Sequence, residues 1–185
     1  KKIREDMVLN LIDPYGIYKV RTCRILSEFC KLENKKLIWL RLFGVYGPYD
    51  NPRWFIPYVI NSALNNFSPK LTDCDQIWDY LYIEDLCECI LKIIIYEKDK
   101  SDFYNFSSNQ EILLSDIVDK IFKIIKPSKS KPLYSSINGN SDLKYLNGDN
   151  SKLQRIYNWK PNTSIEEGLL KTIEFFRNQE RKKIL

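Results

Sequence analysis

Apolar and polar positions along the chain follow two different periods, and together they predict helices alternating with strands. Helical spacing of apolar residues begins after Asp13-Pro14 and continues to about Glu33, with proline in the first turn, where it is favoured. The segment Leu37–Phe43 (LIWLRLF) is short, apolar and bounded by turn residues, which is typical of a strand covered on both faces. The following segment, Gly44–Arg53 (GVYGPYDNPR), is rich in glycine and proline and is predicted to be a loop.

The rest of the chain continues this alternation. A helical pattern resumes at Phe55–Asn65, and Trp78–Ile83 alternates aromatic and aliphatic residues as a strand does. The further predicted elements are a helix at Leu86–Tyr96, a strand at Phe103–Phe106, and helices at Leu114–Ile125 and Ile165–Arg181. Ser164 and Glu167 form a capping box that supports the last helix start. Because no repeat or low-complexity linker interrupts the alternation, an α/β architecture is favoured.

Composition limits the possible chemistry. The 185 residues, 44% of them hydrophobic, are enough for one compact domain. The absence of histidine excludes an imidazole base and histidine-ligated metals. The five cysteines include no C-x-x-C pair, so neither a disulfide framework nor a metal site is expected. Proton transfer must therefore fall to Tyr, Lys, Asp, Glu or Cys.

Charge and hydropathy give expectations about partners and location. The 29 basic residues are interspersed with 24 acidic ones, so a nucleic-acid partner is not expected despite the net charge of +5. The most apolar run, Ile90–Tyr96, is short and contains Lys92, and the first ten residues lack the apolar centre of a signal peptide. We therefore expect no membrane partner and a cytoplasmic location.

Tyr15 and Lys19 are the candidate proton-transfer pair. They lie four residues apart on the first predicted helix, so their side chains leave the same face one turn apart. Tyrosine ordinarily titrates near pH 10 and is a poor base at neutral pH, but a nearby ammonium favours the phenolate. Such a pair can move a proton at an oxygen while hydride moves at the attached carbon. The spacing alone is weak evidence, because the chain has 12 tyrosines.

Five ordered segments resemble a known family, the NAD-dependent epimerases and dehydratases of nucleotide sugars, which are extended short-chain dehydrogenases/reductases. The segment around Tyr15 (IREDMVLNLIDPYGIYK, 3–19) resembles the stretch that holds the family's catalytic tyrosine. The other four are RLFGVYGP (41–48), DYLYIEDL (79–86), YNFSS with the following Ile112–Ile121, and DNSKLQRIYNWKPNTSIEEGL (149–169). Their order and spacing cover nearly the whole chain.

The resemblance implies roles for particular residues. Tyr15 would be the catalytic acid/base, and Lys19 would favour its phenolate and hydrogen-bond the nicotinamide ribose of NAD or NADP. Residues expected beside the nicotinamide and the sugar are Phe43, Gly44 and Val45. Residues expected to line the nucleotide part of a nucleotide-sugar substrate are Phe55 and a strand formed by Lys70, Leu71 and Thr72. For Phe43 and Phe55, core packing is an equally good reading.

The sequence also departs from the family pattern. It contains no G-x-x-G-x-x-G turn for the dinucleotide pyrophosphate, and the family's catalytic Ser or Thr has no counterpart in it. Trp78 stands where the family commonly has an Arg that contacts the substrate diphosphate, and Gly44 stands where Asn is frequent. Arg53, in the neighbouring loop, is the candidate replacement for that charge.

These observations predict that residues 1–185 are the C-terminal portion of such an enzyme: part of a Rossmann-like doubly wound sheet and a small α/β substrate-binding lobe, without the N-terminal dinucleotide-binding lobe. Alone, this portion would expose a sheet edge. The predicted activity is that of an epimerase or 4-keto reductase, with a 4,6-dehydratase as a further possibility, and we expect the full-length protein to be a homodimer. The alternatives are a non-catalytic remnant that binds nucleotide sugars and, from a different class, a nucleic-acid-binding module.

Overall fold

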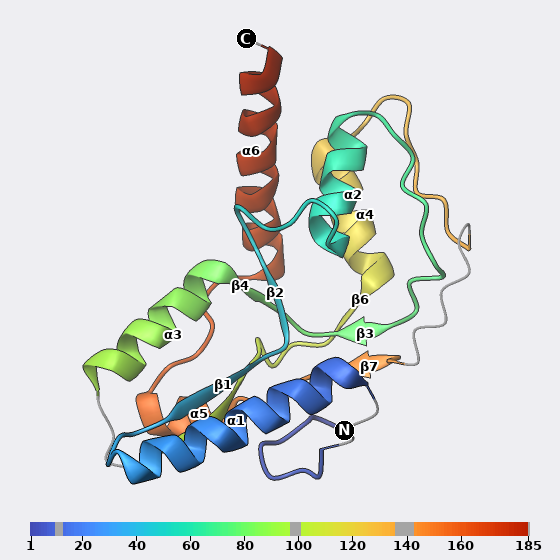
Figure 1. Cartoon of the computed structure of the whole chain (residues 1–185). Coiled ribbons are helices and arrows are strands. Elements are labelled where there is room, and N and C mark those ends of the chain that lie inside the picture. The colour runs from blue at the N-terminus through green and yellow to red at the C-terminus, as the bar shows by residue number, and fades with distance from the viewer. Residues whose placement is uncertain (10–12, 97–100, 136–142, 185) are drawn as a thin grey trace.

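The computed structural model describes the chain except residues 10–12, 97–100, 136–142 and 185 (Figure 1). The helices are α1 (Pro14–Leu32), α2 (Phe55–Leu64), α3 (Ile83–Ile95), α4 (Leu114–Ile125), α5 (Ser151–Tyr157) and α6 (Ile165–Ile184). The strands are β1 (Ile38–Leu42), β2 (Gly44–Tyr46), β3 (Ile77–Trp78), β4 (Tyr80–Tyr82), β5 (Asp102–Phe106), β6 (Ile112–Leu113) and β7 (Tyr145–Leu146). Helices alternate with strands, which confirms the predicted α/β class.

The strand pairs are mostly parallel, as crossover connections through helices require. β1 pairs with β5 in the register Leu40↔Tyr104, and β2 pairs with β4 in the register Val45↔Leu81. β3 lies between β6, to which it is antiparallel, and β7, to which it is parallel. Within the described residues β1 has β5 as its one strand partner, so its other edge is unpaired, as the sequence led us to expect.

Two hydrophobic cores hold these elements together. The first lies among α2, α4 and α6 and is built mainly from aliphatic side chains such as Ile60, Ile117 and Leu169. The second lies between the β1–β5 pair and helices α3 and α5, and it contains Phe106 and Trp159. Figure 1 shows α2, α4 and α6 grouped at one end of the molecule and α1, α3 and α5 at the other. Each core therefore belongs to one lobe.

Several predicted boundaries need correction. The predicted loop Gly44–Arg53 begins as strand β2, because Gly44 to Tyr46 pair with β4. The predicted strand Trp78–Ile83 is interrupted at Asp79, where the chain passes from pairing with β7 to pairing with β2. Helix α3 starts at Ile83 rather than Leu86. The elements α5, β6 and β7 were not predicted.

The predicted strand Lys70–Thr72 is also wrong. This segment forms a single bridge, between Lys70 and Leu133, and continues as irregular chain. The other predicted helices, at α1, α2, α4 and α6, are confirmed to within a few residues. Within the described part of the chain, no helix is both long and apolar enough to cross a bilayer.

Helix α6 crosses the β2–β4 pair at a glycine. The hydroxyl of Ser164 accepts a hydrogen bond from the Glu167 N–H at 3.2 Å, which confirms one half of the capping box. One residue later, a methyl group built on Gly168 would lie 2.1 Å from the hydroxyl oxygen of Tyr46. Tyr46 is itself buried and donates to the Ile165 carbonyl at 3.4 Å. Close approach of the helix therefore requires glycine at this position.

Gly168→Ala should destabilise the fold by about 1–3 kcal/mol, because the methyl group forces α6 away from Tyr46 against the small gain in helix propensity. Urea unfolding followed by circular dichroism measures the change. Asn178→Ala, at an exposed position of the same helix, is the control and should stay within about 0.5 kcal/mol of the native chain. In a Tyr46→Phe background the cost of Gly168→Ala should shrink; an equal cost in both backgrounds would contradict this explanation.

Candidate functional site

Helix α1 places Tyr15 and Lys19 at its exposed N-terminal end. The Asp13 side chain caps the helix by accepting a hydrogen bond from the Gly16 N–H at 2.8 Å, and Pro14 occupies the first turn. Tyr15 is 71% exposed, and Lys19 is exposed beside it with its ammonium nitrogen 5.2 Å from the Tyr15 ring centroid. The predicted pair is therefore on one helix face, and both side chains can reach a bound molecule.

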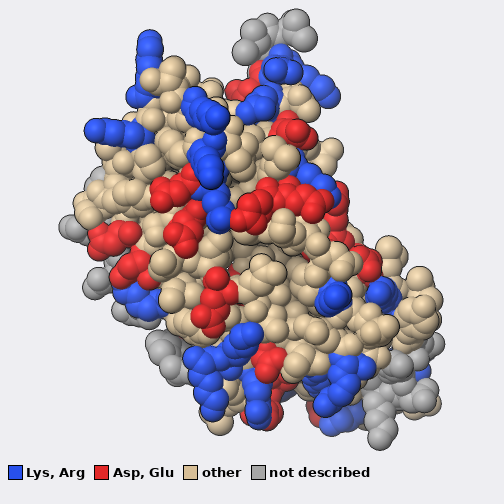
Figure 2. Space-filling model, turned by 180° about the vertical axis from the view of Figure 1, so that it is seen from behind, with Lys and Arg blue, Asp and Glu red and all other residues tan. Residues whose placement is uncertain are grey.

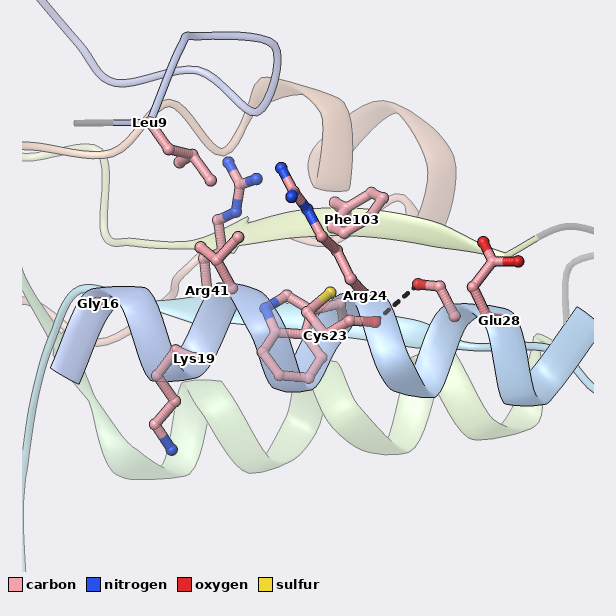
Figure 3. Close-up of a pocket in the computed structure, with 11 residues that line it drawn as sticks. Leu9, Gly16, Lys19, Cys23, Arg24, Glu28, Arg41 and Phe103 are labelled. Atoms are coloured by element: carbon pink, nitrogen blue, oxygen red, sulfur yellow. Dashed lines mark hydrogen bonds between the residues drawn. The ribbon is translucent and has the colours of Figure 1, made fainter. Parts of the chain in front are cut away.

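A cavity of about 490 Å³ lies along another side of α1, between this helix, β1 and β5. Its lining includes Cys23 and Arg24 from α1, Arg41 from β1 and Phe103 from β5 (Figure 3). Burial raises the pKa of the Cys23 thiol, so this sulfur is not an activated nucleophile. The Lys19 stem also lines the cavity, but its ammonium points to the opposite side of α1 from Leu9 and Arg24 (Figure 3). Tyr15 is outside this lining.

The three residues expected near the nicotinamide and the sugar lie where β1 passes into β2. The Phe43 N–H donates to the Phe106 carbonyl at 3.1 Å, and the Gly44 N–H donates to the Asp79 carbonyl at 3.1 Å. A methyl group on Gly44 would lie 2.4 Å from the Asp79 carbonyl oxygen. Glycine in place of the family's frequent Asn thus has a local reason, because this close approach leaves no room for a side chain. Val45 packs at the edge of the second core.

The residues expected around the nucleotide are spread over the first lobe. Arg53 is exposed, and its backbone N–H donates to the Asn51 side chain at 3.0 Å. Phe55 packs against the first core, in agreement with the alternative prediction that this side chain serves core packing. Leu71 is buried with its side chain in the same core, and its N–H donates to the Leu133 carbonyl at 2.9 Å, which leaves the exposed Lys70 side chain available to a ligand. The Thr72 hydroxyl accepts a hydrogen bond from the Cys74 N–H at 3.4 Å.

Two buried carboxylates near this region connect loops. Asp79 accepts hydrogen bonds from the N–H groups of Ser108 and Asn109, and burial raises its pKa to about 6. Asp85 accepts from the N–H groups of Asn162 and Thr163, both at 3.1 Å. These donors come from other segments of the chain and not from the start of α3. Both carboxylates thus have structural partners.

Trp78 lies at the position where the resemblance implies an arginine that contacts the substrate diphosphate. Its indole N–H donates to the Leu143 carbonyl at 3.2 Å, and its ring lies 6.2 Å from that of Tyr80. An indole offers no charge to a diphosphate, so this position cannot make the ionic contact that the family pattern implies.

Asn105, which the sequence analysis did not identify, connects several segments of the chain by hydrogen bonds. It is buried, its side-chain amide donates to the carbonyls of Ile3 and Asp149, and its backbone N–H donates to a Glu5 carboxylate oxygen at 2.9 Å. These bonds attach the N-terminal segment to the end of β5. Its place inside the YNFSS motif is the signal that could have identified it. Within the described residues, no three Cys, Asp or Glu side chains gather as metal ligands do.

Parallel strand pairs, a helix that presents an exposed Tyr-x-x-x-Lys pair and a second small lobe define the class: a Rossmann-like protein of the extended short-chain dehydrogenase/reductase type. A family model described as the NAD dependent epimerase/dehydratase family matches residues 2–106. The chain belongs to this family.

Individual relatives agree with this assignment. The chain is 29% identical over 171 residues to dTDP-glucose 4,6-dehydratase 1 of Escherichia coli (strain K12), covering 88% of this chain and 47% of that protein. It thus spans about half the length of the curated relatives it matches. A crystal structure of UDP-glucose 4-epimerase with UDP-glucose from Thermotoga maritima superposes with a TM-score of 0.87 at 25% identity, over 96% of this chain and 58% of that one.

A second solved structure supports the fold. The dTDP-glucose 4,6-dehydratase of Bacillus anthracis in complex with NAD superposes with a TM-score of 0.84 at 22% identity, over 98% of this chain and 57% of that one. The matched parts of these proteins carry the same arrangement of elements as this chain.

Asp79 should give the fold a measurable pH dependence. Its folded-state pKa of about 6 lies above the ordinary value of 3.8, so the folded state binds this proton more tightly. Its contribution to stability is full below about pH 4 and is lost as pH rises through about 6, with a slope of at most about 1.4 kcal/mol per pH unit. Urea unfolding between these pH values should show that this slope is absent in Asp79→Asn.

The control for this experiment is Asp75→Asn. A hydrogen bond from Lys144 lowers the pKa of the exposed Asp75 carboxyl, so its contribution has the opposite sign and is lost as pH falls. If Asp79→Asn kept the native pH slope in this range, the assignment to Asp79 would be wrong.

Proposed function

We propose that this chain carries the proton-transfer half of an NAD(P)-dependent enzyme that modifies a nucleotide-activated sugar, with Tyr15 as the acid/base and Lys19 as its partner. The observation that carries the proposal is the exposure of both side chains on one face of α1, at 5.2 Å. Neither side chain is used in the cores. The names of the relatives, a dTDP-glucose 4,6-dehydratase and a UDP-glucose 4-epimerase, support the substrate class.

The residues present fit one end of the cofactor. Tyr15 and Lys19 offer a hydroxyl and an ammonium from neighbouring turns, which suits the hydroxyl groups of a ribose. The glycine-rich turn that would hold a pyrophosphate is not among these 185 residues. When bound, the nicotinamide supplies and accepts hydride. We propose that the dinucleotide-binding lobe belongs to the rest of the whole protein.

Tyr15 would then exchange a proton with a sugar hydroxyl as the attached carbon becomes a carbonyl, and would return it in the reverse step. Lys19 holds its ammonium 5.2 Å from the centre of the Tyr15 ring, next to the side chain that would exchange the proton. Phe43, Gly44 and Val45 would border the reacting sugar. Arg53 and Lys70, both exposed, would face the diphosphate and nucleotide, since Trp78 carries no charge. An epimerase or 4-keto reductase is the preferred reaction, and the cytoplasmic location stays a prediction.

Tyr15→Phe in the whole protein should lower kcat at least about 100-fold while leaving cofactor binding nearly unchanged, because the substitution removes one proton-transfer oxygen. Turnover of a panel of nucleotide sugars, with products separated by chromatography, measures the first effect, and cofactor titration measures the second. Tyr18→Phe, an exposed tyrosine on the same helix, is the matched control and should retain activity. Retained activity in Tyr15→Phe would reject the mechanism, and a native protein inactive on every sugar would favour the non-catalytic alternative.

We also propose that the whole protein forms a homodimer through α1. The helix exposes an apolar stripe at helical spacing: Tyr18, Ile25, Phe29 and Leu32. A stripe of this size on a surface helix favours burial against another protein surface.

Ile25→Glu with Phe29→Glu should shift the protein toward monomer, because two carboxylates in an apolar contact lose their hydration. Analytical ultracentrifugation at several concentrations measures the shift. Leu91→Glu with Ile94→Glu, at exposed apolar positions of α3, is the control. Equal dissociation in both double variants, or none in the α1 variant, would show that α1 is not the interface.

A further inference from the structure

Two segments of the lobe formed by α2 and α4 carry basic side chains and no acidic ones. Residues 51–72 and 120–135 together hold seven Lys and Arg residues and no Asp or Glu. Because the whole chain has a net charge of +5, the remainder is net negative. On the back of the molecule, blue side chains lie over the region where Figure 1 places α4, over the C-terminal end of α6 and over the lower part of the view, while red ones lie across the middle (Figure 2).

The two acid-free segments lie against each other. Helices α2 and α4 pack together, and the turns that follow them are joined by hydrogen bonds. The Asn66 side chain accepts from the Ser128 N–H at 3.0 Å, and the Ser68 hydroxyl accepts from the Lys131 N–H at 3.2 Å. The Leu133 N–H donates to the Pro69 carbonyl at 3.0 Å. The charges on these turns are therefore held on a fixed scaffold.

Four lysines form the outer part of this lobe: Lys123, Lys126, Lys129 and Lys131. All four are exposed, and none forms an ion pair with a described carboxylate. Lys120, by contrast, is paired with Glu166 and is not counted among them. A lysine at a helix C-terminus is favoured by the helix dipole, which accounts for Lys123. Lys129 and Lys131 lie beyond the end of α4, so the helix dipole does not account for their charge.

Phe67 adds an apolar group to this surface. It is 70% exposed and follows Asn66, whose side chain contacts the turn that carries Lys129. An exposed aromatic ring among lysines matches the interface of an anionic bilayer, where lysines meet lipid headgroups and the ring enters the acyl boundary. A nucleic-acid strand is matched less well, because base recognition favours planar arginines and several stacking rings.

We propose that Phe67 with Lys123, Lys126, Lys129 and Lys131 forms a docking surface for anionic phospholipid membranes. The surface is separate from Tyr15 and Lys19, which lie on α1 in the other lobe (Figure 1). Docking here would hold the protein at a bilayer while α1 stays accessible. This proposal departs from the expectation of no membrane partner, which rested on the lack of an apolar span and not on the surface charge.

Vesicle flotation of the 185-residue chain tests this proposal, because self-associated protein does not float. Vesicles with equal parts of phosphatidylcholine and phosphatidylglycerol should carry the chain upward at about 0.1 M salt and release it at about 0.5 M, where charges are screened. Vesicles of phosphatidylcholine alone should not carry it. Lack of binding to the anionic vesicles, or equal binding to both kinds, would overturn the proposal.

Charge-matched variants locate the surface. Changing Lys123, Lys126, Lys129 and Lys131 together to Gln should weaken partition to anionic vesicles at least about tenfold. The control changes four other exposed lysines to Gln, Lys1, Lys35, Lys160 and Lys182, and so removes the same charge elsewhere. An equal loss in both variants would show that net charge, not this surface, is responsible.

Phe67→Ser should weaken partition severalfold and leave its salt dependence unchanged, because it removes apolar contact and no charge. Partition equal to that of the native chain would overturn the assignment of Phe67. A chain that binds single-stranded RNA through the four lysines and ignores the vesicles would assign the surface to nucleic acid instead.

Discussion

The arrangement of the two lobes depends on the hydrogen bonds that the buried residue Asp79 forms through its backbone and its carboxylate. Its backbone separates β3 from β4, so the chain pairs with β7 on one side of this residue and with β2 on the other. Its N–H donates to the Leu146 carbonyl, its carbonyl accepts from Gly44, and its carboxylate accepts from Ser108 and Asn109. Four segments that are distant in sequence thus meet at one residue. Replacing Asp79 would leave the partly buried N–H groups of Ser108 and Asn109 without their acceptor, and an unpaired buried polar group costs free energy of folding. This position therefore tolerates little change.

The candidate site follows from that arrangement. Asp79 fixes the start of β2, so Phe43 and Gly44 occupy the junction at the carboxyl end of β1, where open α/β sheets bind ligands. Gly168 brings α6 against Tyr46 and closes the first lobe on the β2–β4 pair. Tyr15 and Lys19, by contrast, have no packing role and are left exposed on α1. The two residues proposed for proton transfer are therefore separate from the buried residues that build the scaffold.

The distribution of charge separates two further regions. The lysines after α4 occupy the lobe formed by α2 and α4, while α1 and the unpaired edge of β1 belong to the other lobe. The two acid-free segments are separated along the sequence by a stretch that contains acidic residues. The segments become one surface when α2 packs on α4.

The sequence by itself determined the long helices, the parallel α/β class and the Tyr15–Lys19 spacing. Periodicity and capping are local signals, and Asp13 before α1 or Ser164 before α6 needs no distant partner to be recognised. Only the tertiary structure decided the short strands β6 and β7, the break at Asp79 and the irregular course of Lys70 to Thr72. Those features exist through hydrogen bonds between distant segments, which no local pattern contains. The role of Trp78 was decided in the same way, by a carbonyl at Leu143 that accepts its N–H.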